Sequence, residues 1–216
     1  MKLHLGCGQR YFEGYVNIDY PLSEHSVQQT SVADQFANLF ELRYQISSID
    51  EVRLHHVFEH FTRAQACASL AAWNSWLKNE GVVHIEVPDF EITAKAVLGL
   101  FASNKVQSVG LRHIFGSQEA HWAVHYEGYS AKRLKKFLEL YGYEIQKINQ
   151  VRYLDTYNLE VIAHKTKSLS KEECRKATLE YLSGFMVADV ESEQTLLKKW
   201  MGDYNEQIEK SFALNG

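Results

Sequence analysis

The feature that most constrains the fold is the segment LHLGCGQRYFEGYVNID at residues 3–19. It predicts a short strand, a Gly-x-Gly turn at Gly6 and Gly8, and a second strand that ends in Asp19. In a parallel sheet, ligands bind beyond the carboxyl ends of the strands, where glycines let the backbone approach them closely. An acidic residue at the tip of the next strand is suited to accept hydrogen bonds from ribose hydroxyls. The segment therefore predicts a nucleotide-type site.

The rest of the chain alternates between strand and helix patterns. The expected strands are 26–34 (ending in Asp34), 51–55, 82–90 (buried on both faces), 143–153 and 159–165, and the expected helices are 62–78 (with Thr62 as N-cap), about 90–110 and 130–142. Residues 111–128, rich in His, Gly and aromatic residues, predict an active-site loop. This order indicates an α/β fold: a Rossmann-like, doubly wound, mostly parallel sheet with a late antiparallel hairpin.

Composition narrows the class of protein. The 216 residues suit one domain, 1–165, and a helical C-terminal extension, 166–216. The formal net charge of −4 disfavours a nucleic-acid partner, and the three cysteines lack the spacing of a disulfide framework or zinc knuckle. No signal peptide and no apolar run of bilayer length is seen, so we expect a cytoplasmic protein without a membrane span.

The glycine pattern discriminates between cofactors. A dinucleotide fingerprint needs a third glycine where this chain has Tyr11, and no Tyr-x-x-x-Lys signature is present, so a nicotinamide-dependent oxidoreductase is disfavoured. S-Adenosylmethionine (SAM) has no pyrophosphate and does not need the helix N-terminus that a dinucleotide site uses. Only a short segment separates Gly8 from Tyr15, too short for a full first helix.

Four blocks carry a resemblance to a known family: LHLGCGQRYFEGYVNID, IDEVRLHHVFEHF, WLKNEGVVHIEVPDFE and YEGYSAKRLKKFLELYGYEI. In this order they resemble class I SAM-dependent methyltransferases, and they are especially similar to bacterial predicted methyltransferases associated with cell-surface glycan biosynthesis. The resemblance implies SAM as cofactor and S-adenosylhomocysteine as product. It also implies methionine contacts at the Gly-x-Gly turn, ribose at Asp19 and adenine at Asp34. The implied cofactor residues are Leu5, Gly6, Cys7, Gly8, Asp19, Asp34, His55 and His56.

Methyl transfer to a hydroxyl needs orientation and a base, and histidine is the usual base near neutral pH. We favour His125, with His121 second, and add Glu59 and His60 as catalytic candidates. The alternative for each histidine is a ring that packs or hydrogen-bonds within its loop. The expected acceptor is a small molecule or a glycan.

His56, Glu59 and His60 form an HxxEH pattern. A zinc-protease interpretation would need this pattern on a helix, but it straddles a strand end. The same block resembles the E-x-x-E-H metal site of some methyltransferases. These three residues are therefore the candidate ligands for a divalent metal, although we do not expect one.

The extension carries apolar stripes under charged faces in two helices. They predict packing on the parent domain, a homodimer seam or a lid over the acceptor. The leading hypothesis for the whole chain is a methyltransferase that methylates a sugar or other small polar hydroxyl. A SAM-binding or regulatory module without catalysis is the alternative.

Overall fold

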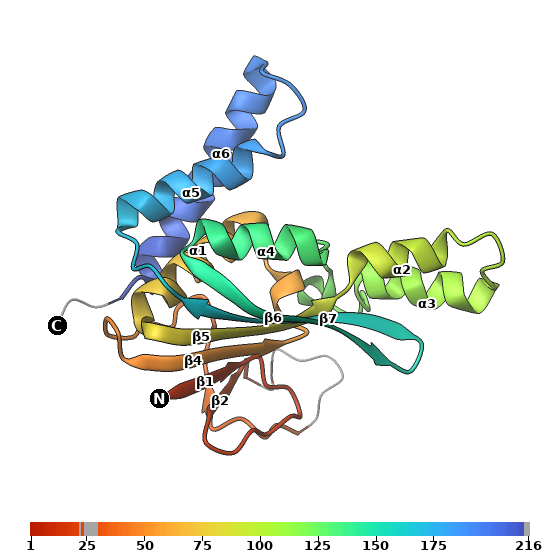
Figure 1. Cartoon of the computed structure of the whole chain (residues 1–216), viewed down its shortest axis with the longest axis horizontal. Coiled ribbons are helices and arrows are strands. Elements are labelled where there is room, and N and C mark those ends of the chain that lie inside the picture. Colours follow the sequence, from red (N-terminus) through yellow and green to blue (C-terminus); the bar gives the residue numbers. More distant parts are fainter. Residues whose placement is uncertain (22, 24–29, 214–216) are drawn as a thin grey trace.

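The computed structural model describes residues 1–21, 23 and 30–213. They form one seven-stranded sheet in the order β3-β2-β1-β4-β5-β7-β6 (Figure 1). The strands are β1 (Lys2–Leu5), β2 (Val16–Asp19), β3 (Gln35–Phe36), β4 (Ile49–His55), β5 (Leu77–Pro88), β6 (Tyr143–Tyr153) and β7 (Thr156–Lys165). From β1 the chain winds outward to β3 and then back through β4 to β5, all in parallel, whereas β7 is antiparallel to β5 and β6. The doubly wound, mostly parallel sheet with its late hairpin is confirmed.

The helices begin where local signals predict them. They are α1 (Arg63–Trp76), α2 (Phe90–Val97), α3 (Asn104–Phe115), α4 (Ala131–Leu140), α5 (Lys171–Ser183) and α6 (Glu191–Ser211), with 3-10 turns η2 (Phe58–His60) and η3 (His121–Ala123). Thr62 caps α1 through a reciprocal capping box with Gln65, and Ser130 caps α4. The helix expected over residues 90–110 is instead two antiparallel helices, α2 and α3, because the chain turns back at residues 98–103.

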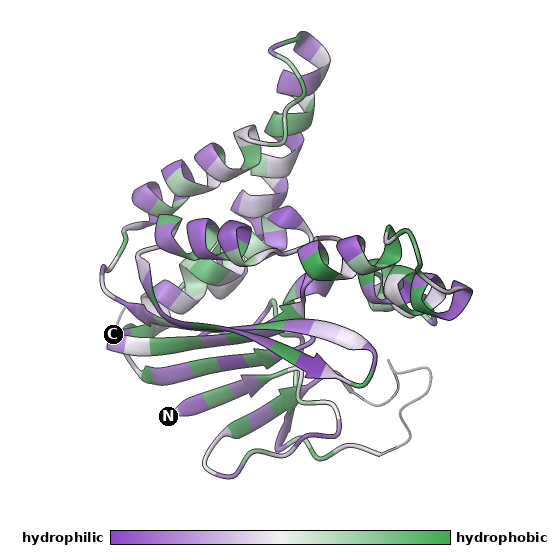
Figure 2. Cartoon of the chain, turned by 45° about the vertical axis from the view of Figure 1, so that its right-hand side comes forward, coloured by the Kyte–Doolittle hydropathy of each residue, from purple (hydrophilic) through white to green (hydrophobic). Residues whose placement is uncertain are grey.

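The two faces of the sheet differ in chemistry. Hydrophobic and polar residues alternate along the strands (Figure 2), and α1 and α4 cover the apolar face (Figure 1). The strand expected at 82–90 is buried along most of its length, as predicted, but one of its two faces carries polar side chains. Val83 and Ile85 are fully buried in the core, whereas His84 and Glu86, one position out of phase, bond to Glu160 and Asn158 of β7. Among the described residues no α-helix lies between β1 and β4.

The C-terminal extension packs on α1 rather than standing apart. Leu197, Met201 and Tyr204 of α6 belong to the same buried cluster as Trp73 and Trp76 of α1. The Trp76 indole N–H also donates to the Ser211 carbonyl at 2.9 Å. Helix α1, rich in alanine and buried on nearly all sides, therefore lies between the sheet and the extension (Figure 1).

One predicted strand is misplaced. The strand expected at 26–34 falls partly outside the described residues, and β3 begins only after Asp34. Asp34 therefore lies at the amino end of β3, level with Asn17, and its Oδ2 accepts hydrogen bonds from the Asn17 backbone N–H at 2.8 Å and the Asn17 side chain at 2.9 Å. The prediction that Asp34 ends a strand is wrong, because β3 begins only at Gln35, and the contact of Asp34 with an adenine stays a prediction.

Candidate active site

The Gly-x-Gly turn lies at the carboxyl end of β1. Gly6 and Gly8 have positive φ angles of 67° and 56°, a conformation that side chains disfavour. A Cβ on Gly6 would lie 2.4 Å from the Val57 side chain, so the turn abuts the segment after β4. A Cβ on Gly8 would meet nothing within 4 Å, so this backbone borders open space. A ligand can therefore approach the backbone of this turn closely at Gly8.

Asp19 orders this turn from the end of β2. Its Oδ2 accepts the Gly8 N–H at 2.8 Å, and its Oδ1 accepts the Tyr20 N–H at 2.8 Å. The Asp19 carboxylate therefore fixes the backbone of the turn from the neighbouring strand. Burial, with a further contribution from the Asp19 charge, raises the pKa of the Cys7 thiol to about 12. Cys7 therefore stays a neutral lining group rather than a nucleophile.

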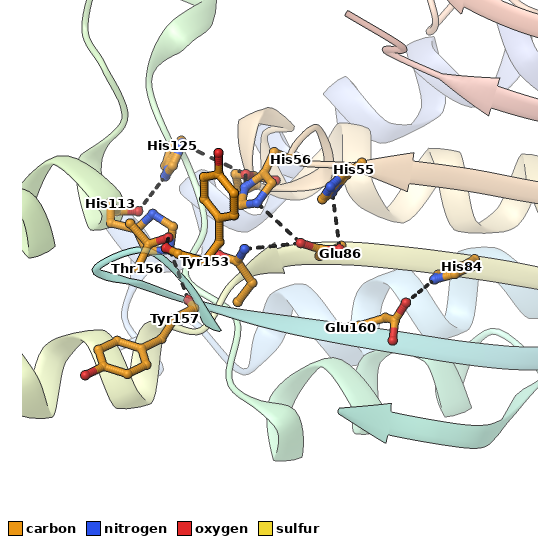
Figure 3. Close-up of polar contacts among 12 residues, drawn as sticks. His55, His56, His84, Glu86, His113, His125, Tyr153, Thr156, Tyr157 and Glu160 are labelled. Atoms are coloured by element: carbon orange, nitrogen blue, oxygen red, sulfur yellow. Dashed lines mark hydrogen bonds and ion pairs between the residues drawn. The ribbon is translucent and has the colours of Figure 1, made fainter. Parts of the chain in front are cut away.

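A histidine and glutamate cluster lies next to this turn, at the carboxyl ends of β4 and β5. It contains His55, His56, Glu59, His60, Glu86 and His125. Figure 3 shows the contacts of His55 and His56 with Glu86. His56 bridges the two carboxylates, with Nδ1 3.2 Å from Glu59 Oε1 and Nε2 3.7 Å from Glu86 Oε1. The His125 Nε2 lies 4.0 Å from the same Glu59 oxygen.

The electrostatics of the cluster separate one charged histidine from neutral ones. Burial alone would lower the pKa of His56, but the hydrogen bonds and charges of Glu59 and Glu86 outweigh it and raise that pKa to about 9. Burial lowers the pKa of His55 to about 4 and also lowers the pKa of His125, where Glu59 opposes it. At neutral pH His56 is thus an imidazolium, whereas His55 and His125 are neutral.

Backbone carbonyls orient the rings of His125 and His60. His125 Nδ1 lies 3.0 Å from the His113 carbonyl, and His60 Nδ1 lies 3.1 Å from the Val124 carbonyl. A carbonyl oxygen only accepts, so each Nδ1 carries a proton, and the neutral His125 ring keeps a lone pair on Nε2. The two rings meet edge to face, with centroids 4.6 Å apart. Nε2 of His125 is therefore a proton acceptor beside a buried carboxylate.

The loop that carries His125 is held by its own backbone. The Glu59 carbonyl accepts N–H groups from Tyr126 at 2.9 Å and Glu127 at 3.3 Å. Gly116, with φ of 86°, ends α3, and a Cβ there would lie 2.1 Å from the Ala123 carbonyl oxygen. A glycine is required at this crossing, which brings residues 116–125 back towards Glu59.

The sequence candidates are only partly brought together. His125, Glu59, His60, His55 and His56 meet at one edge, whereas His121 is exposed at the start of η3 and is not a member of the cluster. Glu86 is a member that the sequence analysis missed. The signal for it was the alternation within VVHIEVP, which places Glu86 at the ligand end of β5 on the polar face.

Among the described residues, two sets of side chains have metal-ligating atoms within 4.8 Å of one another: Glu59 with His60 and His125, and His55 with His56 and Glu86. The predicted triad of His56, Glu59 and His60 is divided between them. In the first set the Oε2 of the buried Glu59 has no hydrogen-bond partner in the described structure. The imidazolium of His56 compensates a carboxylate of each set, since it lies 3.2 Å from Glu59 and 3.7 Å from Glu86.

Comparison with solved structures defines the class of fold. The chain resembles 1,6-didemethyltoxoflavin N1-methyltransferase of Burkholderia thailandensis, solved with 1,6-didemethyltoxoflavin and S-adenosylhomocysteine, at 15% identity and a TM-score of 0.51 over 77% of this chain and 71% of that one. It also resembles the putative methyltransferase solved with the Trm112 methyltransferase activator of Haloferax volcanii (12% identity, TM-score 0.52, 78% and 83% covered). The fold is that of class I SAM-dependent methyltransferases.

A third match is the PH0226 protein of Pyrococcus horikoshii OT3, at 14% identity and a TM-score of 0.51 over 76% of this chain and 81% of that one. No family model matches the sequence, and no curated protein matches it. The shared property at these identities is the fold, so the activity of this chain has to be argued from its own residues.

Proposed function

We propose that this chain is a SAM-dependent methyltransferase that methylates a hydroxyl group of a sugar or another small polar acceptor, with His125 as the general base. One observation carries the proposal: a neutral histidine with a free Nε2 faces a buried carboxylate at the same sheet edge as the Gly-x-Gly turn. The B. thailandensis enzyme of this fold binds S-adenosylhomocysteine, which supports the cofactor.

In the proposed reaction the Gly6–Gly8 turn would hold the methionine part of SAM and Asp19 would hold the ribose. SAM, when bound, would supply the methyl group for in-line transfer to the acceptor oxygen, with S-adenosylhomocysteine as the leaving group. His125 Nε2 takes the hydroxyl proton, and the ionised Glu59 stabilises the imidazolium that forms. Burial disfavours ionisation of Glu59, but its contacts with His56 prevail and keep the pKa of Glu59 below its usual value.

Two aromatic side chains support a sugar acceptor. Phe115 and Tyr126 are each about half exposed, at 53% and 51%, and their backbones flank that of His125. Exposed aromatic faces next to a polar group suit sugar rings. Tyr129, by contrast, is buried against Phe58 and supports the core instead.

The cofactor is tested by isothermal calorimetry with SAM, S-adenosylhomocysteine and, as a control, NADH. Binding of the first two without NADH is the expected result, and Asp19→Asn should weaken it about tenfold or more, since a buried charge-assisted acceptor is lost. Absence of SAM binding would refute the proposal.

The base is tested with SAM carrying a labelled methyl group and a panel of glycosides and nucleotide sugars. His125→Gln should lower turnover by roughly 10²- to 10⁴-fold while SAM affinity stays the same. His121→Gln is the matched control, since His121 lies outside the cluster. SAM binding with no turnover on any acceptor, and no effect of His125→Gln, would favour the non-catalytic SAM-binding module.

We also propose that no divalent metal takes part, because the His56 imidazolium compensates the Glu59 charge. Turnover should then be unchanged by EDTA. If EDTA abolished turnover and one divalent ion restored it, Glu59, His60 and His125 would be metal ligands and the base would have to be another group.

A further inference from the structure

The connection between α2 and α3 exposes an apolar tip. Leu98, Leu100 and Phe101 are 83%, 91% and 95% exposed. They lie within four residues at the far end of a two-helix arm that projects from the body of the molecule (Figure 1), and Figure 2 shows the hydrophobic character of this connection. Single exposed apolar residues are ordinary on a protein surface, but three almost fully exposed apolar side chains at the tip of one arm are unusual.

The arm differs in charge from the rest of the chain. From Phe90 to Phe115 the arm has Lys95, Lys105 and Arg112 against one acidic residue, Glu91, whereas the whole chain has a formal net charge of −4. Lys95 pairs with Glu91, and Lys105 lies 3.9 Å from Asp155 of the β6–β7 connection. Val106 and Leu111 add apolar surface to α3, at 40% and 46% exposed. An apolar point with basic residues behind it is the pattern of a segment that enters the interface of an anionic bilayer.

The shape favours a lipid surface over a protein partner. A stable protein interface needs about 20 residues on each side around a flat, well-packed centre. The tip provides three large side chains at the end of a narrow arm. A bilayer accepts such a wedge without a matching pocket, and the exposed side chains of Lys105 and Arg112 can extend to headgroup phosphates.

The geometry points to peripheral attachment of this protein to an anionic lipid bilayer, through insertion of Leu98, Leu100 and Phe101 below the headgroups. Among the described residues no helix is long and apolar enough to cross a bilayer, so attachment at the interface is the mode that this surface suits. The proposal concerns binding alone and does not require that the chain transfers methyl groups.

The attachment has a consequence for the candidate active site, and this consequence rests on the proposed function. His113, in the last turn of α3, receives the His125 Nδ1–H on its carbonyl and lies at the base of the arm. Its Nε2 bonds to the Tyr157 carbonyl of β7 at 3.0 Å, which anchors the arm to the sheet (Figure 3). A bilayer at the tip would face the same end of the molecule as the cluster, which favours an acceptor carried on a lipid.

The test is sedimentation of the full chain with vesicles of phosphatidylcholine and phosphatidylglycerol, compared with phosphatidylcholine alone. The tip variant is Leu100→Ser with Phe101→Ser. The matched control is Val187→Ser, because Val187 is also 91% exposed, on the connection between α5 and α6, where acidic residues follow it. A charge variant combines Lys105→Gln with Arg112→Gln.

We expect the wild type to bind anionic vesicles and the tip variant to bind on the order of a hundredfold less, since two large apolar side chains are lost. The control should bind like the wild type, and the charge variant should bind less and depend less on salt. Failure of the wild type to bind, or equal binding of the tip variant, would overturn the proposal. So would light scattering that showed a wild-type dimer converted to a monomer by the tip substitutions. SAM calorimetry on the same samples is independent of each of these outcomes.

Discussion

The charge on His56 makes a quantitative prediction for stability. Its pKa is raised to about 9 from an ordinary 6.5, against the effect of burial, by Glu59 and Glu86. At 1.36 kcal/mol per pKa unit this difference corresponds to about 3 kcal/mol. The ring is 35% exposed, so solvent screens the interaction, and about 1 to 2 kcal/mol is the expected contribution to the free energy of unfolding.

The sign follows from proton linkage. Below pH 6.5 the ring is charged in both the folded and the unfolded chain, and the contribution is complete. Between pH 6.5 and about 9 the unfolded chain has lost this proton, whereas the folded protein still holds it. The contribution therefore falls as the pH rises, and it is lost once the folded protein also releases the proton. Wild type and His56→Gln should therefore differ more in stability at pH 6 than at pH 10, by about 1 to 2 kcal/mol.

Urea unfolding of both proteins at pH 6 and pH 10 measures this difference. The tyrosines and lysines titrate in both proteins, so their effects on stability cancel in the comparison. NMR of the imidazole rings gives a direct check, since one histidine should titrate near pH 9 and shift downwards in Glu59→Gln. A difference in unfolding free energy that is the same at both pH values, together with a His56 pKa near 6.5, would refute the reasoning.

Three further outcomes are expected. Gly6→Ala should destabilise the protein by about 1 to 3 kcal/mol and weaken SAM binding, because its Cβ meets Val57, whereas Gly8→Ala should cost less; equal unfolding midpoints for the two would contradict this. Thr62→Ala should lower the free energy of unfolding by about 1 kcal/mol, because the capping box of α1 is lost. Urea titration measures this change, with Thr195→Ala at an exposed position of α6 as the control. A chain that ends at Lys165 should lose its cooperative unfolding, because the α6 partners of Trp73 and Trp76 are removed; a native-like circular dichroism melt would show that residues 1–165 fold alone.

Much of the fold was accessible from the sequence because its signals are short in range. The Gly-x-Gly turn, the strand that ends in Asp19 and the Thr62 cap each depend on residues within a few positions of one another, and the β6–β7 hairpin joins two strands that are adjacent in the sequence. Periodicity and capping act through neighbouring backbone groups, so they can be interpreted without knowledge of the rest of the chain. The segment between Gly8 and Tyr15 is too short for a full first helix, and the structure has no helix there.

The candidate site depends on contacts that no local pattern contains. Glu86 joins His56 because β4 and β5 are paired in register, and Glu59 meets His125 because the loop after α3 is pinned by backbone bonds to the Glu59 carbonyl. Asp34 was misassigned because strand β3 is only two residues long and its position comes from pairing with β2. Such partners are selected by burial and hydrogen bonding across many tens of residues. The sequence therefore determined which groups were available, and the tertiary structure decided which of them meet, which stay neutral and which become charged.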